Sequence, residues 1–345
     1  MRKVTKINVL VVEDSLLFRE TLAREIAKDA SIEVIGTAKD VYEASEKIIE
    51  LRPDVVTLDI ELPKMDGIAF LKKLMPQYPV PVVVISSIGD KVFDALDAGA
   101  VDFVTKPETF RSGTLESFIR EIITKIKIAS TAKVGNFKKA DKAGSTGSGF
   151  SSDIAKKIIA IGASTGGTEA IYNIIKTLPK NTPGILIVQH MPPVFTRLYA
   201  ERLNNSCVLE VKEAEDGDVV VPGRVLVAPG EYHMRLESRS SGMYVTCKAG
   251  EKVSGHCPSV DVLFDSVAKV AKENAIGVIL TGMGRDGADG LLEMRKQGAY
   301  TIGQDEASSV VYGMPMVANN IGAVSKQLPL DQIAEEICRR LSLDC

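Results

Sequence analysis

Short apolar runs alternate with helical patterns in the first part of the chain. Between the first two runs, Phe18, Leu22 and Ile26 recur at the spacing of one helical face. Strands that are apolar throughout and separated by helices are typical of a parallel sheet covered on both faces. We therefore predict a doubly wound, five-stranded parallel domain over residues 1–128. Its strands are expected at Ile7 to Val12, Ile32 to Ile35, Asp54 to Leu58, Pro81 to Ile85 and Asp102 to Thr105.

A segment nearly free of large apolar residues follows, over residues 129–153. It reads ASTAKVGNFKKADKAGSTGSGFSSD and is rich in Gly, Ser and Lys. Such a composition cannot bury enough apolar surface to offset the entropy lost on ordering. We therefore predict a flexible linker between two domains.

The alternation of strands and helices resumes over residues 154–345. Apolar strands are predicted at Lys157 to Ile161, Gly184 to Gln189 and Ile276 to Leu280. A helical face begins at Val260. Three alternating segments favour antiparallel hairpins: Arg224 to Ala228, Tyr232 to Glu237 and Met243 to Lys248. The sequence thus predicts a second doubly wound, mostly parallel α/β domain with a β-hairpin insertion.

Composition narrows the class of protein. A length of 345 residues, a hydrophobic fraction of 45% and a net charge of −3 indicate a globular chain without the basic field that attracts nucleic acid or anionic lipid. No apolar run approaches the roughly 18 residues of a membrane span. The five cysteines include no C-x-x-C pair. This argues against a zinc site or disulfide framework and favours reduced thiols in the cytoplasm.

Acidic residues follow the predicted strands at one edge of the first sheet. Glu13 and Asp14 come after the first strand and Asp59 after the third, while Ser86 and Lys106 follow the fourth and fifth. The carboxyl ends of parallel strands meet at one edge, so these side chains are expected together. Three carboxylates favour a hard cation such as Mg²⁺, and a carboxylate there can accept a phosphoryl group. The alternative is that these acids are helix N-caps or solvated loop ends.

This half of the chain resembles the receiver domain of two-component response regulators, over residues 5–127. The motifs VLVVEDS, PDVVTLDIELPKMDG and FVTKP carry the resemblance. It implies that Asp59 is the phospho-acceptor and that phosphorylation uses Mg²⁺. It also implies roles for six other positions: Glu13, Asp14 and the Glu61 carbonyl as metal ligands, Ser86 as switch hydroxyl, Lys106 as phosphate-bridging cation and Phe103 as aromatic switch. For Phe103, plain core packing is the alternative.

A Gly-rich turn joins a strand to a helix early in the second domain. Residues 162–167 read Gly-Ala-Ser-Thr-Gly-Gly and match G-x-S-x-G, in which small residues expose the hydroxyl of the serine, here Ser164. The helix N-terminus beside it would stabilise a negative tetrahedral intermediate. Such a turn can also bind dinucleotide phosphates, although G-x-G-x-x-G is absent. A purely structural turn is the third interpretation.

A base and a carboxylate are expected at the same edge of the second sheet. His190 directly follows a predicted strand, whereas His233 lies in a predicted hairpin and His256 in a loop. Asp286 lies on the loop after another strand, and the competing Asp289 looks like a first-turn helix residue. In this interpretation His190 takes the proton of Ser164 and Asp286 holds the imidazole tautomer, whatever their order along the chain.

The oxyanion of an acyl-transfer reaction needs hydrogen-bond donors. Main-chain N–H groups at Thr165 and near Met283 lie at the right strand ends to supply them. Cys207 and Cys257 are weaker candidates for the nucleophile, because neither lies on a strand-to-helix turn.

The second half extends the resemblance to the chemotaxis response regulator protein-glutamate methylesterases. The motifs IGASTGG, QHMP and TGMGRDGADG follow a receiver and a linker in that order. The resemblance implies Ser164, His190 and Asp286 as the triad and a main-chain oxyanion donor at Met283. It implies hydrolysis of glutamyl γ-methyl esters on the cytoplasmic helices of methyl-accepting chemoreceptors, and often deamidation of receptor glutamines. It also implies a histidine kinase as phosphodonor and an unphosphorylated receiver that obstructs the active site.

Two other classes of function stay open at this point. One is a response regulator whose output domain binds DNA, which the acidic net charge and the missing C-terminal basic helix oppose. The other is a nucleotide-binding oxidoreductase that uses the turn at residues 162–167. Binding of duplex DNA or of nicotinamide cofactors would distinguish them from a hydrolase.

Overall fold

The computed structural model describes residues 6–63, 65–87, 89, 91–107, 112–135, 154–240 and 242–344. The chain divides into two compact units, Met1–Phe137 and Lys138–Cys345. Most of the predicted linker, residues 136–153, lies outside the described residues.

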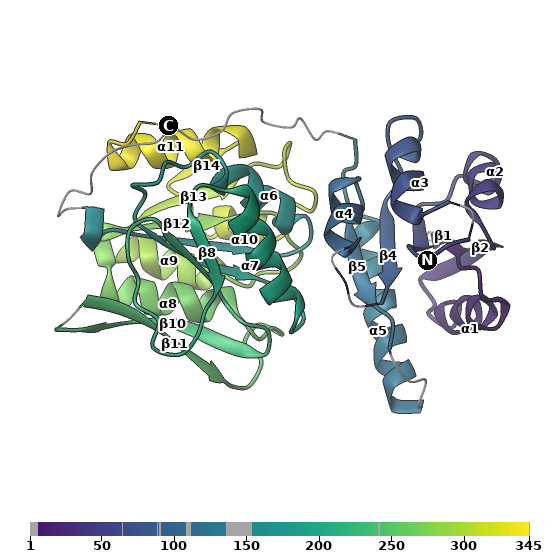
Figure 1. Cartoon of the computed structure of the whole chain (residues 1–345), viewed down its shortest axis with the longest axis horizontal. Helices are drawn as coiled ribbons and strands as arrows, with labels where there is room; N and C mark the ends of the chain where they lie inside the picture. Colours follow the sequence, from purple (N-terminus) through teal and green to yellow (C-terminus); the bar gives the residue numbers. More distant parts are fainter. Residues whose placement is uncertain are drawn as a thin grey trace. The chain divides into compact units, whose positions relative to one another are not determined.

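The first unit is built on a parallel sheet of five strands with the order β2-β1-β3-β4-β5. Helices α1 and α5 contact each other, as do α2 and α3, and α3 and α4, so helices cover both faces (Figure 1). The strands are β1 (Ile7–Val12), β2 (Ile32–Ala38), β3 (Val55–Asp59), β4 (Val82–Ser86) and β5 (Asp102–Thr105). The helices are α1 (Leu16–Ile26), α2 (Val41–Leu51), α3 (Gly67–Leu74), α4 (Lys91–Asp97) and α5 (Ser112–Ala129).

Local sequence explains where three of these helices begin. Ser15 accepts a hydrogen bond from the N–H of Phe18 at the start of α1, and Asp40 and Asp66 accept equivalent bonds at the starts of α2 and α3. Such N-cap oxygens satisfy donors that the helix leaves free. Every residue of β3 and β4 is buried, as a strand covered on both faces requires. The predicted fold of this unit is confirmed.

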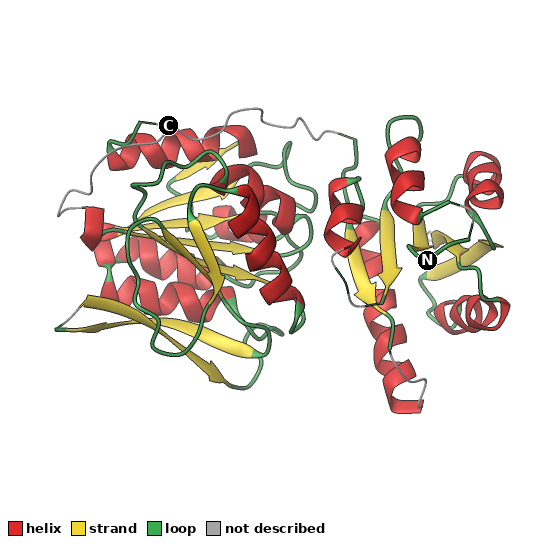
Figure 2. Ribbon diagram, in the orientation of Figure 1, coloured by secondary structure: helices red, strands yellow, loops and turns green. Residues whose placement is uncertain are grey.

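The second unit contains a seven-stranded sheet with the order β14-β13-β12-β6-β7-β9-β8, and all its neighbouring strands are parallel. Strands β10 and β11 form a separate antiparallel hairpin that lies against α8 (Figures 1 and 2). The sheet strands are β6 (Ile158–Ala163), β7 (Gly184–Gln189), β8 (Glu210–Glu213), β9 (Arg224–Val227), β12 (Ala275–Ile279), β13 (Tyr300–Gln304) and β14 (Lys326–Leu328). The hairpin strands are β10 (Tyr232–Arg239) and β11 (Gly242–Ala249).

Helices cover both faces of this sheet, so the predicted architecture is confirmed. Helices α8, α9 and α10 pack in series on one face, and α6 contacts α11 on the other (Figure 1). Side chains of α8, the hairpin and the sheet share one hydrophobic core, which includes Leu236, Val245 and Phe264. The helices are α6 (Gly167–Ile175), α7 (Phe195–Ser206), α8 (Val260–Val270), α9 (Ala288–Lys296), α10 (Met314–Asn320) and α11 (Leu330–Leu341), with short 3₁₀ turns η1 (Ile154–Lys156) and η2 (Lys272–Asn274).

The prediction for Arg224 to Ala228 is wrong in one respect. This segment is β9, which pairs in parallel with β7 and β8 inside the main sheet and not in an antiparallel hairpin. Its residues Val225, Leu226 and Val227 are all buried. A run that is apolar on both faces suits an inner strand of a parallel sheet, whereas the true hairpin strands keep exposed positions.

The prediction of reduced cysteines is also wrong at one position. Cys338 on α11 is disulfide-bonded, whereas Cys207, Cys247 and Cys257 are free. An odd count without a C-x-x-C pair argues against a framework of several bridges, but it does not exclude a single bond. Among the described residues, no helix combines the length and apolar character that crossing a membrane would need.

Candidate functional site

The first unit gathers opposite charges where three strands end. Lys106, just after β5, places its Nζ 2.7 Å from Asp59 Oδ2 and 3.1 Å from Glu13 Oε2. Asp59 ends β3 and Glu13 follows β1, and each carboxylate is 1% exposed. Burial and the nearby Asp59 charge raise the pKa of Glu13 to about 7, although Lys106 opposes the shift. Burial would lower the pKa of Lys106, but its bonds to both carboxylates outweigh burial and raise it.

The donor set of this pocket fits a hard cation. Glu13, Asp14 and Asp59 each offer an oxygen within 4.8 Å of the others, and Asp14 is exposed to solvent. Three carboxylates beside one lysine leave an excess of negative charge, and carboxylate oxygens are the ligands that Mg²⁺ prefers. The N–H of Glu61 donates a 3.0 Å hydrogen bond to Asp59 Oδ1, which holds the chain at residue 61 beside the pocket. The carbonyl of Glu61 as a metal ligand stays a prediction.

The two predicted switch residues lie on neighbouring strands. Ser86 ends β4 and is buried, with its hydroxyl donating a 2.9 Å hydrogen bond to the Ser87 carbonyl. Phe103 is buried on β5, opposite Val84 of β4. Their switch roles stay predictions, because this arrangement also suits core packing.

Sequence reasoning missed Arg19 at this pocket. Its Nη1 donates to the carbonyl oxygens of Glu13, at 2.6 Å, and Asp14, at 3.1 Å. Arg19 therefore fixes the backbone that carries two candidate metal ligands. Arg19 lies on the first turns of α1, six residues after Glu13 and five after Asp14. This spacing was the signal in the sequence that could have placed it at the pocket.

The second unit places Ser164 on a sharp turn between β6 and α6. The N–H of Ser164 donates to the Thr281 carbonyl at 3.0 Å, and its carbonyl accepts from Gly167 at 2.7 Å. Gly166 is the N-cap of α6 with φ at +77°, and a side chain there would lie 2.5 Å from Val310 Cγ2. Glycine is therefore required for the turn that leaves Ser164 half-buried beside a helix N-terminus.

His190 lies beside this serine because β6 and β7 are neighbours. Ala163 pairs with Gln189, and the His190 N–H donates to the Ala163 carbonyl at 3.1 Å, so residues 164 and 190 leave the sheet side by side. The imidazole Nε2 is 2.7 Å from Asp286 Oδ2. The structure thus brings the three candidate triad residues to one rim, with two of them in direct contact.

Asp286 is held as a carboxylate by the start of α8. It accepts hydrogen bonds from the Ser259 hydroxyl at 2.7 Å, the Val260 N–H at 2.8 Å and the Asp261 N–H at 3.1 Å, besides its contact with His190. Burial would raise the pKa of Asp286, but the bonds from His190, Ser259 and Val260 overcome it and lower the pKa to about 2. A helix N-terminus adds a favourable dipole for this charge.

This contact selects the imidazole nitrogen available for proton transfer. An ionised Asp286 accepts the proton on Nε2, which leaves Nδ1 with a lone pair. Nδ1 is buried and has no hydrogen-bond partner among the described residues. Among the described residues, no hydrogen bond joins the Ser164 hydroxyl to His190. The hydrogen bond between a nucleophile and its base often tightens only when substrate binds.

The predicted oxyanion residues flank Ser164. Thr165 is buried, and its carbonyl accepts from the Thr281 hydroxyl at 2.9 Å. Met283 is 46% exposed and follows Gly282, where a side chain would lie 2.7 Å from Ser164 Cβ. The competing Asp289 forms an exposed ion pair with Arg285 at 2.6 Å, and among the described residues the carboxylate bonded to His190 is that of Asp286. Donation to an oxyanion stays a prediction for both Thr165 and Met283.

Two further residues join the rim without having been predicted. The buried Gln189 amide donates to the carbonyls of Ser164, at 3.0 Å, and His190, at 3.2 Å. His256 stacks on His190 with ring centroids 3.7 Å apart. Gln189 was signalled only as the last residue of an apolar strand, and His256 lies on a loop, so the rule that brings strand ends together did not pair it with His190.

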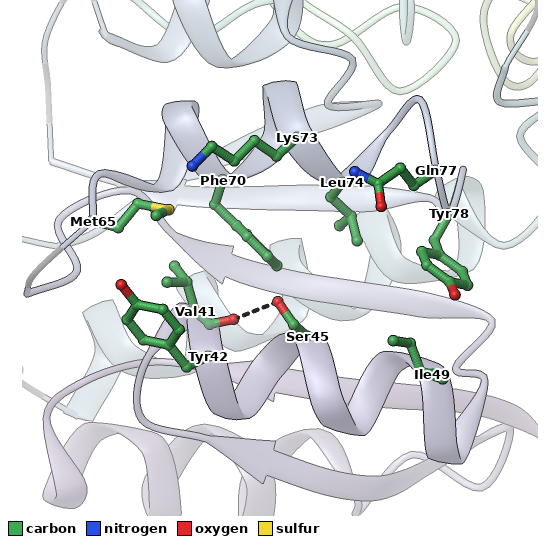
Figure 3. A pocket seen from close by; sticks show the side chains of 10 residues that line it. All are labelled: Val41, Tyr42, Ser45, Ile49, Met65, Phe70, Lys73, Leu74, Gln77 and Tyr78. Atoms are coloured by element: carbon green, nitrogen blue, oxygen red, sulfur yellow. Dashed lines mark hydrogen bonds between the residues drawn. The ribbon is translucent and has the colours of Figure 1, made fainter.

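A separate groove of about 290 Å³ lies between α2 and α3 of the first unit (Figure 3). Its wall is mostly apolar, and its rim carries the exposed Tyr42 and Tyr78. Ser45 turns its hydroxyl to the Val41 carbonyl, so it is already satisfied. The groove contains none of the predicted site residues.

Each unit of the chain matches a known protein family. The family model described as CheB methylesterase matches residues 159–337, and the response regulator receiver domain model matches residues 9–117. Together the two matched segments contain every predicted site residue.

Individual relatives match the whole chain or one unit. A protein-glutamate methylesterase/protein-glutamine glutaminase 2 of Syntrophomonas wolfei is 57% identical, with 99% of each chain covered. A protein-glutamate methylesterase/protein-glutamine glutaminase of Syntrophotalea carbinolica is 52% identical, with 98% of each covered. The crystal structure of the Thermotoga maritima CheB methylesterase catalytic domain has a TM-score of 0.52 and 40% identity, and the match covers 53% of this chain and 98% of that one.

Proposed function

Since the chain belongs to the CheB methylesterase family and carries a response regulator receiver domain before the esterase domain, we propose that it is a serine hydrolase acting on chemoreceptors. It demethylates glutamyl γ-methyl esters and deamidates glutamines on the cytoplasmic receptor helices. The observation that carries the proposal is the 2.7 Å contact of His190 with Asp286, beside the strand end that bears Ser164. Family membership disfavours a DNA-binding output domain and a nucleotide-dependent oxidoreductase.

The proposed reaction is acyl transfer to water. His190 Nδ1 takes the hydroxyl proton as Ser164 Oγ attacks the γ-carbonyl carbon, giving a tetrahedral oxyanion. The N–H groups of Thr165 and Met283 donate to this oxygen. The intermediate collapses to an acyl-serine, and His190 returns the proton to the departing methoxide or amide, which leaves as methanol or ammonia. Water then cleaves the acyl-serine by the same steps and releases the receptor glutamate.

Asp286 acts through His190. Its carboxylate holds the proton on Nε2, so that Nδ1 stays a base, and it stabilises the imidazolium that forms during the attack. Its four hydrogen-bond donors keep it ionised across the physiological pH range. A group held in this way orients a base without competing for the proton.

We propose that phosphorylation of the receiver gates this reaction. A histidine kinase is the phosphodonor and Asp59 the acceptor. Glu13, Asp14, Asp59 and the Glu61 carbonyl would hold Mg²⁺, which neutralises charge on the phosphoryl oxygens when bound. Lys106 and Ser86 would contact those oxygens, and Phe103 would follow the movement of Ser86. We propose that the protein carries out these reactions in the cytoplasm.

The direct test is mass spectrometry of methylated receptor peptides before and after incubation with the enzyme. Demethylation and deamidation are then read separately at each glutamate and glutamine. We expect both with the wild-type protein and neither with Ser164→Ala. Activity retained by Ser164→Ala in a folded protein would remove this serine from the mechanism.

The phosphorylation step needs its own measurement. A small phosphodonor with Mg²⁺ should raise the esterase rate of the wild-type chain. Absence of any stimulation, in a protein that hydrolyses esters, would leave the hydrolase intact and refute the gating.

A further inference from the structure

His256 covers one face of the candidate base. The imidazoles of His190 and His256 have centroids 3.7 Å apart, and their planes differ by only 7°. The side chain of His190 is 7% exposed and binds Asp286 through Nε2. The second imidazole is therefore part of the wall that surrounds the ring whose other nitrogen is assigned to take the serine proton.

A tight turn presents His256 to that ring. The backbones of Val253 and His256 exchange two hydrogen bonds, of 3.0 Å and 2.9 Å. The residues between them, Ser254 and Gly255, have φ values of +52° and +85°, as in the two-residue turns that close hairpins. The position of His256 is thus fixed locally by its own backbone.

The residues that follow this turn in the chain form hydrogen bonds with Asp286. Ser259, Val260 and Asp261 donate the three bonds that hold the Asp286 carboxylate. Asp261 also accepts the Ser254 hydroxyl at 3.0 Å, which ties the turn to the start of α8. Residues 253–261 therefore contact both His190 and Asp286.

We propose that His256 is a positioning residue, which fixes the ring plane of His190 so that Nδ1 keeps its orientation for proton transfer. The assignment rests on the proposed hydrolase function. One hydrogen bond at Nε2 fixes a single atom and leaves the ring free to tilt about it. A parallel ring in van der Waals contact removes that freedom, because any tilt would press one edge of His190 into His256.

The test compares three variants of the full chain. His256→Ala removes the stack, and His256→Phe keeps a flat ring without the imidazole nitrogens. Val253→Ala is the matched control, because Val253 belongs to the same turn and keeps its backbone bonds. Steady-state kinetics on a methyl ester substrate give kcat and KM, and thermal unfolding reports folding. The NMR signal of the His190 Nε2 proton reports ring order independently of activity.

With the stack removed, we expect kcat to fall by about tenfold to a hundredfold, as small misplacements of a base do. KM should stay within about twofold, because the substrate does not contact His256 in this proposal. His256→Phe should recover to within about threefold of wild type, since ring stacking is retained. The Nε2 proton signal should broaden or vanish in His256→Ala and persist in His256→Phe and Val253→Ala.

Three results would overturn the assignment: an unchanged kcat and Nε2 signal in His256→Ala, equal losses of kcat in the Ala and Phe variants, or a rise in KM alone. A wild-type protein without Ser164-dependent esterase activity would instead refute the proposed function. The NMR comparison would then still decide whether His256 orders the ring.

Discussion

The two sheets place their chemistry at the same topological position but treat a buried carboxylate in opposite ways. In the first unit, Asp59 and Glu13 share one lysine, and burial together with mutual repulsion raises the pKa of Glu13 to about 7. In the second unit, Asp286 has four donors to itself, and its pKa is lowered to about 2. The carboxylates of the first site outnumber their one lysine, whereas the carboxylate of the second site is satisfied by hydrogen-bond donors.

The difference in hydrogen-bond partners suits two tasks. The pocket of the first unit must take up a cation and a phosphoryl group, whereas Asp286 in the second unit must keep the same charge throughout the reaction. A pocket with excess negative charge is completed by a cation and a phosphoryl group, so its state changes with its ligands. A carboxylate saturated with hydrogen bonds stays ionised and keeps one geometry. A regulatory pocket and a catalytic rim can therefore share one kind of strand end and differ only in the partners of the acid.

The largest effect expected within the comparison comes from Asp286→Asn. The amide keeps the size of the side chain, but it no longer requires the proton to sit on His190 Nε2. We expect kcat to fall by roughly 10⁴-fold, as for removal of the orienting acid in other triads. Steady-state ester hydrolysis measures the loss, and a fall smaller than about tenfold would show that the tautomer is set by other groups.

Asp59→Asn tests the opposite side of the comparison. The variant has no carboxylate to accept a phosphoryl group, so stimulation by a small phosphodonor with Mg²⁺ should disappear entirely. The ratio of esterase rates with and without phosphodonor is the measurement. Asp29→Asn is the matched control, because Asp29 also pairs with a lysine, Lys127, at 2.7 Å in the same unit but outside the pocket. Stimulation that survives in Asp59→Asn would place the acceptor elsewhere.

The ends of most strands could be predicted, because apolar runs that alternate with helical patterns indicate a parallel sheet from the sequence alone. The positions of Glu13, Asp59, Ser164 and His190 followed from that rule. Contacts that depend on side-chain packing between distant segments did not follow. The stack of His256 on His190 and the grip of residues 259–261 on Asp286 are of this kind.

The strand β9 shows the same limit for the fold. The sequence predicted a strand at this place, but its alternating pattern wrongly favoured an antiparallel hairpin. In the structure, β9 is buried and pairs within the seven-stranded sheet. Whether a strand is buried on both faces depends on the helices that cover the sheet, and these lie elsewhere in the sequence. Periodicity thus predicts that a strand exists, whereas its neighbours follow from the whole domain.

Gln189 offers a smaller test of how rigid the catalytic rim is. Its amide bridges the carbonyls of Ser164 and His190, so Gln189→Leu removes both donors and keeps most of the volume. We expect kcat to fall by about tenfold through misplacement of the two residues. The free energy of unfolding should fall by about 1–2 kcal/mol, because the His190 carbonyl loses its Gln189 donor while the Ser164 carbonyl keeps only the Gly167 N–H.

The control for this variant is Gln297→Leu, which removes an exposed amide that bonds only to Glu293 among the described residues. Kinetics and urea unfolding of both variants give the comparison. An equal response of the two would mean that the bridge at Gln189 does not position the rim.

The smallest effect concerns Asp261, a buried acid in contact with the segment that holds Asp286. Burial and the neighbouring Asp286 charge raise the pKa of Asp261 from 3.8 to about 6, although the Gly290 N–H opposes the shift. Between these pH values the folded protein retains a proton that the unfolded chain has lost. Folding stability from this group is therefore present below about pH 4 and declines as the pH rises to about 6. Asp286 acts in a separate window, because its stabilisation is lost only as the pH falls from 3.8 toward about 2.

Asp261→Asn isolates the first of these windows. The amide oxygen can still accept the Gly290 N–H, and the NH₂ group can donate to Ser254. The variant should gain stability relative to wild type between pH 4 and pH 7, on the order of 1 kcal/mol, because it has no charge to bury. Urea unfolding of both proteins at the two pH values, followed by circular dichroism, measures the difference. A relative loss of stability at pH 7 would show that the Asp261 charge supports the turn, which would make the two buried aspartates of this unit alike.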